Sequence, residues 1–325
     1  MIKEYCNSNK NFLKLYQKGK FMEYILETNN LEKIYGKFKA IGNLNMHIPK
    51  GSIYGLIGKN GAGKTTLIRL LCGLQKPTSG TYTIHGVLNE SKEIVKARKK
   101  IGAIIESPSI CLNMTAEENL KMQYEVIGLP SFDGLHEILK LVGLNDAEGK
   151  KAKYFSLGMK QRLGIAIALV GKPDLLILDE PIDGLDPEGI IEIRELILKL
   201  NKKDGITFLI SSHYLDELSK IATHYGFIDN CKIIKEISKN DLEQSFKTKI
   251  QINISNLKEC EKYLEEKNIP YQVVSNNVID IYEKINVSEI VMALSKRNCI
   301  VNNFQEKEES LENYYLKLIG GANNE

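Results

Sequence analysis

The chain has 325 residues, 43% hydrophobic and 26% charged, which is enough for a sizeable core and two domains. Its net charge of +3 is too small to favour binding to nucleic acid or to an anionic membrane surface. Its six scattered cysteines form no CxxC pair, so they indicate neither a zinc site nor disulfides and suit a reducing cytoplasm. No apolar run approaches the ~18 residues of a membrane span and residues 1–5 lack a signal-peptide core, so we expect any membrane part to come from another chain.

Residues 1–21 differ from the rest of the chain because they are polar and lysine-rich and have no clear periodicity. An alternating strand, residues 24–28, follows Met22. Two interpretations of residues 1–21 stay open. In the first, translation begins at Met22, and Lys18–Phe21 is encoded by purine-rich codons that resemble a bacterial ribosome-binding site. In the second, the segment is a genuine N-terminal tail. We predict three parts, residues 1–21, 22–245 and 246–325.

A glycine-rich segment follows a buried strand that we predict over residues 52–57. It reads Gly58-Lys59-Asn60-Gly61-Ala62-Gly63-Lys64-Thr65-Thr66, a complete GxxxxGK[ST] phosphate loop, or Walker A motif. Its glycines let backbone N–H groups cradle phosphate oxygens, and a helix predicted over 67–71 adds its N-terminal dipole. We expect Lys64 to reach the β- and γ-phosphates of ATP, and Thr65 to be placed for Mg²⁺.

The pattern is mainly helical between residues 107 and 171, where Thr115 and Glu118 predict a capping box. A buried strand over residues 175–178 then ends in Asp179 and Glu180. Such a strand delivers Asp179 beside the phosphate loop, where it can hold Mg²⁺ together with Thr65. Glu180 points elsewhere and can polarise the water that attacks the γ-phosphate.

The remaining elements continue the α/β order. Asp186 and Pro187 begin a long amphipathic helix that Gly205 ends, and a buried strand (206–210) and a hairpin (227–234, turn at Asp229-Asn230) follow. Beyond about Lys247 we predict strands at 250–254, 271–274, 278–282 and 300–304, and helices at 257–267, 287–297 and 310–318. This βαββαβ order with a final helix predicts a small α+β ferredoxin-like accessory domain after an α/β P-loop domain.

The segment Tyr154–Leu163 reads YFSLGMKQRL. It resembles the signature of the ATP-binding subunits of ABC transporters, commonly LSGGQ followed by a basic residue, Gln and Arg; Leu157 and Met159 depart from that form. The resemblance implies a RecA-like core with antiparallel β and helical subdomains. It also implies that Ser156 and Gly158 complete the ATP site of the opposite protomer in a head-to-tail homodimer. The resemblance is strong over residues 22–235, weaker over 236–318 and absent over 1–21.

Other positions match the family in order. Asp183–Asp186 resembles the D-loop, which implies that Asp186 takes part in communication between the two ATP sites. His213 follows two serines and resembles the switch histidine that contacts the γ-phosphate, and Tyr35 resembles the aromatic residue that stacks on adenine. A histidine after a strand and a tyrosine near a strand end are also common as structural residues.

Glu106 stands where the family usually has a glutamine that senses Mg²⁺ and the attacking water. A carboxylate there adds negative charge near the triphosphate. With the Ser-Leu-Gly-Met-Lys-Gln-Arg signature and the accessory tail, it resembles the bacitracin-export and lantibiotic-immunity subgroup. That resemblance, and not residue chemistry, implies export of, or immunity to, an antimicrobial peptide.

We therefore predict a cytoplasmic ATPase subunit, peripheral on the inner face of the cell membrane, that couples ATP hydrolysis to transport by a separate permease and binds no nucleic acid. The lysine-rich stretch 96–100 is interpreted as a solvated helix face. The alternative is a soluble ABC-type ATPase that acts on ribosomes or DNA, against which stand the single cassette and the lack of sustained heptads. The signature segment and the missing NKxD element argue against a P-loop kinase or GTPase.

Overall fold

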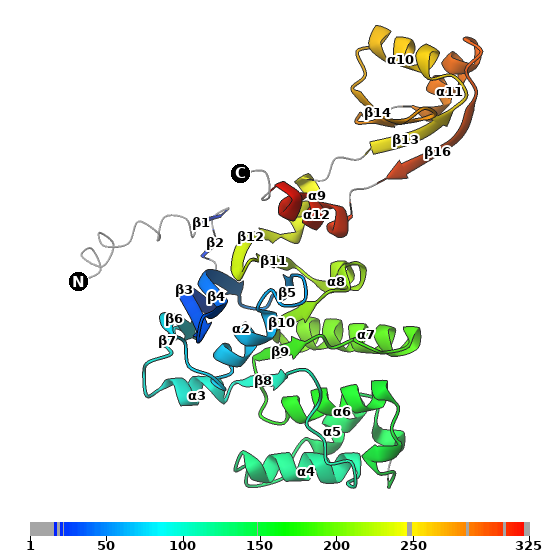
Figure 1. The fold of residues 1–325 in the computed structure, drawn as a ribbon. Helices are drawn as coiled ribbons and strands as arrows, with labels where there is room; N and C mark the ends of the chain where they lie inside the picture. The colour runs from blue at the N-terminus through cyan, green and yellow to red at the C-terminus, as the bar shows by residue number, and fades with distance from the viewer. Residues whose placement is uncertain are drawn as a thin grey trace. The chain divides into compact units, whose positions relative to one another are not determined.

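The chain folds into two compact units that divide between Lys239 and Asn240, and each has its own cluster of buried hydrophobic residues (Figure 1). The computed structural model describes residues 16–17, 20–21, 23–147, 149–245, 249–283, 286–307 and 310–321. The predicted boundary at 245/246 falls later in the chain and stays a prediction. The two interpretations of residues 1–21, with Met22, lie mostly outside the described residues, among which β1 (Tyr16–Gln17) pairs antiparallel with β2 (Lys20–Phe21).

A six-stranded sheet forms the centre of the first unit, in the order β12-β11-β5-β10-β9-β8. Its strands are β5 (Ile53–Ile57), β8 (Ile101–Ile104), β9 (Leu175–Asp179), β10 (Thr207–Ser212), β11 (His224–Asp229) and β12 (Lys232–Ser238). All neighbours pair in parallel except β11 and β12. Every residue of β5, β9 and β10 is buried, which explains their continuous apolar sequences. Ile57 pairs with Ser212 and Asp179 with Ser211, so the carboxyl ends of these three strands share one edge.

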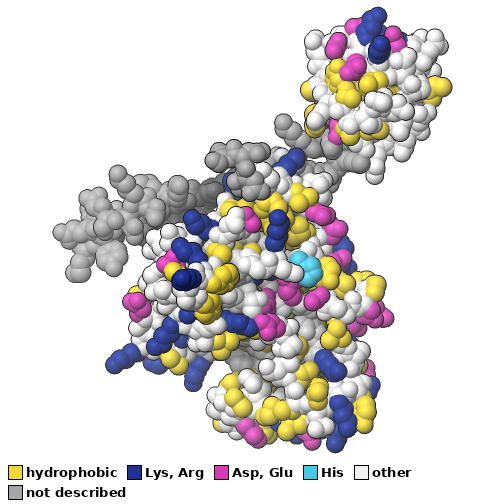
Figure 2. All heavy atoms as spheres, viewed as in Figure 1, with side chains coloured by type: hydrophobic (Ala, Val, Ile, Leu, Met, Phe, Trp, Pro, Cys, Tyr) yellow, Lys and Arg dark blue, Asp and Glu magenta, His cyan; other side chains and the backbone are white. Residues whose placement is uncertain are grey.

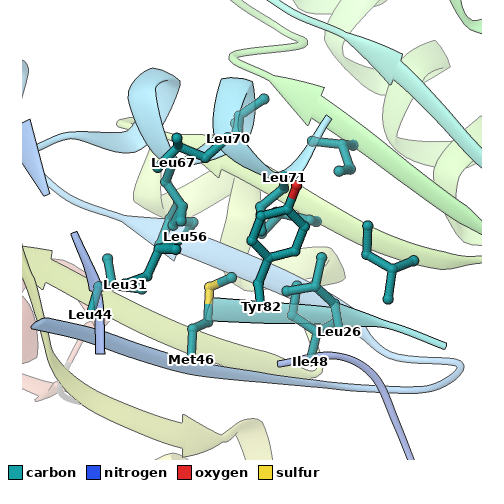
Figure 3. Packing of buried hydrophobic residues seen from close by; sticks show 14 of the residues in the cluster. Leu26, Leu31, Leu44, Met46, Ile48, Leu56, Leu67, Leu70, Leu71 and Tyr82 are labelled. Carbon is teal, nitrogen blue, oxygen red and sulfur yellow. The ribbon is translucent and has the colours of Figure 1, made fainter. Parts of the chain in front are cut away.

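A second, antiparallel sheet packs with the helix of the phosphate loop, α2 (Lys64–Leu71). Its order is β4-β3-β6-β7, and its strands are β3 (Tyr24–Tyr35), β4 (Phe38–Pro49), β6 (Ser79–Ile84) and β7 (Val87–Leu88). Figure 3 shows Leu26 and Met46 of this sheet on the same cluster as Leu56 of β5 and Leu67 of α2. This shared core fixes α2, and with it the phosphate loop, against both sheets.

The lysine-rich stretch lies on and just after α3 (Ile94–Arg98), over which Lys and Arg side chains gather in Figure 2. Lys96, Lys99 and Lys100 are exposed, as predicted for a solvated face. Arg98 differs, because its guanidinium donates to the hydroxyl of buried Tyr82. That part of the stretch is therefore a packing contact rather than a solvated side chain.

The helical region follows β8, as predicted. Its helices are α4 (Ala116–Val126), α5 (Leu135–Leu141) and α6 (Leu157–Leu169), with short 3-10 turns η2 (Asn145–Ala147) and η3 (Ala152–Tyr154). The predicted capping box is confirmed: the Thr115 N–H donates to Glu118 Oε2 at 2.7 Å and the Glu118 N–H donates to Thr115 Oγ1 at 3.1 Å. Within the described parts of the chain, no helix combines the length and apolar character needed to cross a bilayer.

Two further helices begin after strands that end at the carboxyl edge of the central sheet. α7 (Pro187–Asp204) begins after Asp186 and ends at Gly205, whose φ of +68° is left-handed, as predicted; α8 (Leu215–Ile221) follows β10. The predicted turn of the β11–β12 hairpin is wrong by one residue. Its central residues are Asn230 and Cys231, with φ of +45° and +64°. The Cys231 carbonyl accepts the Gly42 N–H at 2.8 Å, which helps to hold this cysteine in an unusual conformation.

The second unit contains a four-stranded antiparallel sheet in the order β14-β15-β13-β16. Its elements are α9 (Lys239–Ser245), β13 (Lys249–Ile254), α10 (Leu257–Glu266), β14 (Tyr271–Ser275), β15 (Val278–Ile281), α11 (Val287–Ser295), β16 (Val301–Lys307) and α12 (Leu311–Gly321). Ile252, Leu264, Ile279 and Leu294 contribute to its core. This strand order is that of the predicted ferredoxin-like βαββαβ arrangement.

Candidate active site

The phosphate loop joins the end of β5 to the start of α2, and close backbone contacts require glycine at two of its positions. A Cβ at Gly63, where φ is +106°, would lie 2.5 Å from the Ala40 carbonyl oxygen, and one at Gly58 would lie 2.6 Å from the Ile228 carbonyl oxygen. Among the described residues no side chain caps α2, so its first N–H groups remain available to an anion. Of the other predicted loop residues, Asn60 and Gly61 are exposed, Ala62 is buried and Thr66 is half-buried.

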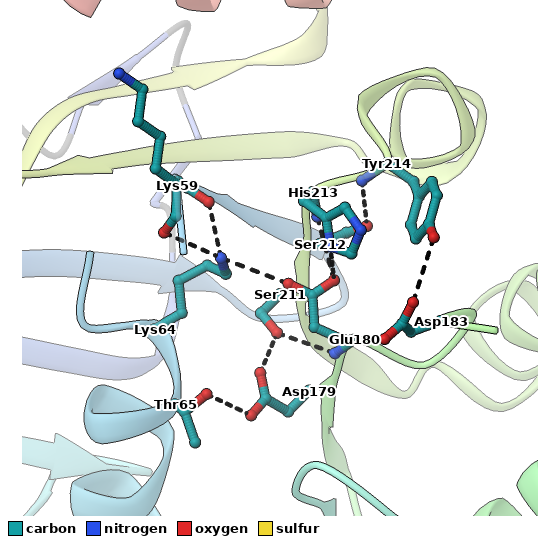
Figure 4. A network of polar contacts seen from close by, with 11 residues as sticks. Lys59, Lys64, Thr65, Asp179, Glu180, Asp183, Ser211, Ser212, His213 and Tyr214 are labelled. Atoms are coloured by element: carbon teal, nitrogen blue, oxygen red, sulfur yellow. Dashed lines mark hydrogen bonds and ion pairs between the residues drawn. The ribbon is translucent and has the colours of Figure 1, made fainter. Parts of the chain in front are cut away.

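Lys64 is folded back into this loop (Figure 4). Its Nζ donates to the Gly58 carbonyl at 2.7 Å and to the Lys59 carbonyl at 3.4 Å, and it lies 3.4 Å from Glu180 Oε1. The side chain is only 7% exposed, so its charge is directed into the loop and not into solvent. The position suits a cation that meets a bound phosphate.

Asp179 lies at the end of β9 and is 2% exposed. Its Oδ2 accepts a hydrogen bond from the Thr65 hydroxyl at 2.8 Å, and its Oδ1 accepts one from the Ser211 hydroxyl. A carboxylate and a hydroxyl oxygen so close together beside Lys64 are the hard donors that Mg²⁺ takes, with phosphate and water oxygens completing its shell. The residues therefore fit the predicted ion. Ser211 was missed as a site residue, although a serine at the end of a buried strand could have indicated it.

Glu180 follows β9 in a left-handed conformation with φ of +49°. Its N–H donates to the Ser211 carbonyl and to the Ser211 hydroxyl, each at 3.1 Å, which holds this uncommon backbone. The carboxylate Oε2 lies 2.9 Å from His213 Nδ1 and accepts the His213 N–H at 3.2 Å. The structure thus brings together Lys64 from the start of α2, Glu180 from the loop after β9 and His213 from the loop after β10 (Figure 4).

Glu106 lies in the loop after β8 and forms an ion pair on the phosphate-loop helix. Its Oε1 accepts from Arg69 Nη2 at 2.6 Å, with the two side chains 63% and 37% exposed, and its φ is +63°. Arg69 lies one helical turn after Thr65. Arg69 was not among the predicted site residues, although its i, i+4 spacing from Thr65 on α2 places both on one helix face. The pair gives the negative charge of Glu106 a positive partner next to the phosphate loop.

Ser156, Gly158 and Asp186 form a different cluster. Ser156 caps α6, with its hydroxyl accepting the Met159 N–H at 3.2 Å, and Asp186 caps α7, accepting the Gly189 N–H at 3.0 Å. A Cβ on Gly158 would lie 3.7 Å from Gly189 Cα. These contacts place the signature segment against the start of α7, and not against the phosphate loop of the same chain.

Tyr35 lies at the end of β3 with 42% of its surface exposed. Its hydroxyl donates to the Gln75 side-chain carbonyl, and Lys33 Nζ lies 5.0 Å from its ring centroid. The ring is thus held at one edge while part of its surface is open. This geometry is compatible with a stacking platform, and the adenine contact itself stays a prediction.

The groups at this edge suit a nucleotide: backbone N–H groups and a buried ammonium can bind a phosphate, and the Glu180 carboxylate beside them can receive a proton. These are the parts of a P-loop nucleoside triphosphatase. Residues 41–183 match the family model described as ABC transporter.

Similarity to known proteins identifies the family of nucleoside triphosphatases to which the chain belongs. The chain is 40% identical over 303 residues, 93% of this chain and 98% of the relative, to the bacitracin transport ATP-binding protein BcrA of Enterococcus faecalis. It is 44% identical over 229 residues, 70% of this chain and 97% of the relative, to the lantibiotic transport ATP-binding protein SrtF of Streptococcus pyogenes. A solved dimeric ATP-binding cassette in a post-hydrolysis state, bound to ADP and Pi, is similar with a TM-score of 0.59 and 26% identity, covering 66% of this chain and 98% of that one. The chain belongs to the ATP-binding proteins of ABC transporters, and its enzymatic activity is ATP hydrolysis.

Proposed function

We propose that this ATPase drives export of, or immunity to, an antimicrobial peptide through a separate membrane permease on which it docks from the cytoplasmic face. The ATPase part of the proposal rests on one observation. The side chains of the site lie together at one edge of the sheet: Lys64, Asp179, Glu180 and His213. The peptide substrate is supported by the names of the relatives, BcrA and SrtF. The match to BcrA extends over 93% of this chain, whereas that to SrtF extends over 70%, which favours a bacitracin-like peptide.

The contacts support the following roles within one chain. Backbone N–H groups of residues 60–65 and Lys64 bind the phosphates of ATP, while Tyr35 stacks on adenine. Thr65 and Asp179 would hold Mg²⁺, which would supply positive charge to the phosphates of ATP. Glu180 accepts a proton from the attacking water.

His213 and Glu106 support this step. The imidazole of His213 lies 2.9 Å from the Glu180 carboxylate, so it can hold that carboxylate and meet the γ-phosphate. Glu106 approaches the site from the loop after β8, with its charge balanced by Arg69.

The site needs a second copy of the chain. Ser156, Gly158 and Asp186 lie against α7 in their own chain, where they cannot reach its phosphate loop without rearrangement. We infer a head-to-tail homodimer in which each signature segment closes the ATP site of its partner, consistent with the dimeric form of the similar cassette. ATP binding then favours the closed dimer and ADP release favours the open one.

A susceptibility assay tests the proposed substrate. The gene is expressed in a sensitive bacterium together with the gene of a permease that co-purifies with the chain, and the minimal inhibitory concentrations of bacitracin and of a lantibiotic are measured. We expect the native chain to protect and Lys64→Ala and Glu180→Gln to fail, while Glu195→Gln, an exposed change on α7, protects like the native chain. Equal susceptibility of all strains to both peptides, with all chains present at equal levels in the membrane fraction, would contradict the peptide substrate.

A further inference from the structure

Tyr214 follows the switch histidine and contacts two of the loops that build the site (Figure 4). Its ring centroid lies 4.1 Å from that of the His213 imidazole, with 38° between the ring planes. Its hydroxyl donates to Asp183 Oδ1 at 3.3 Å, and its backbone N–H donates to the Ser212 hydroxyl at 2.9 Å. The side chain therefore touches both the loop after β10 and the loop after β9.

These contacts close a circuit around the proposed base. The Asp183 N–H donates to the Glu180 carbonyl at 3.2 Å, which ties Asp183 to the base through the backbone. The Glu180 carboxylate meets His213 Nδ1 at 2.9 Å, and His213 packs on Tyr214. The tyrosine hydroxyl then returns to Asp183. Each member of this set therefore contacts the next one.

The surroundings favour this circuit. Desolvation, the hydrogen bond to Asp183 and the charge of Glu180 raise the pKa of Tyr214, so that its hydroxyl keeps the proton that it donates. Behind the loops lies a cavity of about 20 Å³ whose lining includes Ser212. Arg194 of α7 and Glu217 of α8 pair beside it at 2.7 Å.

We propose that Tyr214 is a positioning residue of the ATPase. Its ring orients the imidazole of His213, and its hydroxyl ties that imidazole to residues 181–186, so that movement of this loop displaces His213 from Glu180. The inference rests on the proposed roles of Glu180 and His213. It adds to those roles a residue, Tyr214, that couples the position of the D-loop to the position of His213 within one chain.

Steady-state ATP hydrolysis by the full chain tests the hydroxyl. Tyr214→Phe keeps the ring and removes one hydrogen bond, so we expect kcat to fall about threefold to tenfold, with KM for ATP within about twofold of native. Tyr214→Leu removes the ring as well and is expected to lower kcat further. Tyr124→Phe is the matched control, since its hydroxyl donates to the Asp133 carbonyl at 2.7 Å in the helical region. The control should keep the native kcat.

The imidazole position gives a readout that does not depend on turnover. The chain has five histidines, so His213 can be assigned in a spectrum of ¹³C-labelled histidine by comparison with His213→Gln. We expect its resonance to move in Tyr214→Leu, which loses the neighbouring ring current, and to change little in Tyr214→Phe or Tyr124→Phe. Native kcat in both Tyr214 variants, or an unmoved His213 resonance in Tyr214→Leu, would overturn the proposal. A native chain without ATPase activity would instead contradict the role of the site, and the spectrum would still judge the contact.

Discussion

Replacement of Glu180 by glutamine separates the two things that this carboxylate does in the structure. Its Oε2 accepts from the backbone N–H of His213 and lies 2.9 Å from the imidazole, and its Oε1 lies 3.4 Å from Lys64 Nζ. Glutamine has nearly the same shape, and its carbonyl oxygen can still accept from His213. It cannot take a proton from water at neutral pH, and it carries no charge toward Lys64.

The expected magnitudes follow from these contacts. A positioned general base contributes about 10²–10⁴ in rate, so hydrolysis by Glu180→Gln should fall by that factor, equal to about 3–5 kcal/mol of barrier. ATP affinity should hold or rise, because Lys64 is 7% exposed and loses a competing carboxylate 3.4 Å away. Slow turnover with retained binding should trap the closed dimer.

The assay combines single-turnover hydrolysis of γ-labelled ATP with size-exclusion chromatography in ATP and Mg²⁺. Glu180→Gln should elute as an ATP-containing dimer, whereas the native chain and Glu195→Gln should hydrolyse and elute chiefly as monomer. Turnover by Glu180→Gln within about threefold of native would refute its assignment as the base. A tenfold loss of ATP affinity would refute the argument from the charge facing Lys64.

Three more changes follow from the structure. Lys64→Ala removes the buried ammonium and should weaken ATP binding about tenfold or more in a calorimetric titration; native affinity would contradict the phosphate-loop assignment. Arg69→Ala should weaken ATP binding while Glu106 is present and have little effect in a Glu106→Gln background. Additive effects in this double-mutant cycle would contradict a contribution of the ion pair to ATP binding. The hydrogen bond to Glu236 raises the pKa of His47 above its usual 6.5, so this pair stabilises the fold fully below pH 6.5 and loses that contribution as pH rises through the folded-state pKa. The melting temperature of His47→Gln should therefore lie below that of the native chain by an amount that shrinks from pH 5.5 to pH 8.5. A difference that grows with pH would contradict the direction of the pKa shift.

The phosphate-binding half of the site could be predicted because its determinants are local in sequence. Residues 58–66 are contiguous, and Asp179 directly follows an apolar run that only a buried strand explains. Parallel pairing of the strands then predicted that these residues lie close together, since the carboxyl ends of β5, β9 and β10 meet at one edge. The Thr65–Asp179 contact, across 114 positions of the chain, thus needed only the sheet type.

Two contacts beside these residues could not be predicted in the same way, those of Arg69 with Glu106 and of Tyr214 with Asp183. Both depend on the conformation of loops that follow different strands, and one of these loops holds Glu106 with a positive φ. Such conformations depend on tertiary hydrogen bonds, as at Glu180, whose backbone is held by Ser211. The hairpin turn at Asn230-Cys231 was misplaced for the same reason, since cysteine is rarely left-handed.

In the second unit, the order of strands and helices was enough to predict the topology. Ile250, Ile252 and Ile254 all face one core, so the strand period was plain in the sequence, and Asn256 caps α10 as an ordinary helix start. Alternation carries no information about a ligand, and the task of this unit does not follow from its fold.

Purification of the tagged chain from its native membranes in mild detergent tests most directly whether it powers a transporter. The chain carries Lys64→Ala in a parallel preparation, as a control for partners that depend on nucleotide. We predict that a polytopic membrane permease is retained in stoichiometric amount by the native chain and identified by mass spectrometry. Retention of ribosomal or DNA-bound proteins without a permease would contradict the account and favour a soluble ABC-type ATPase.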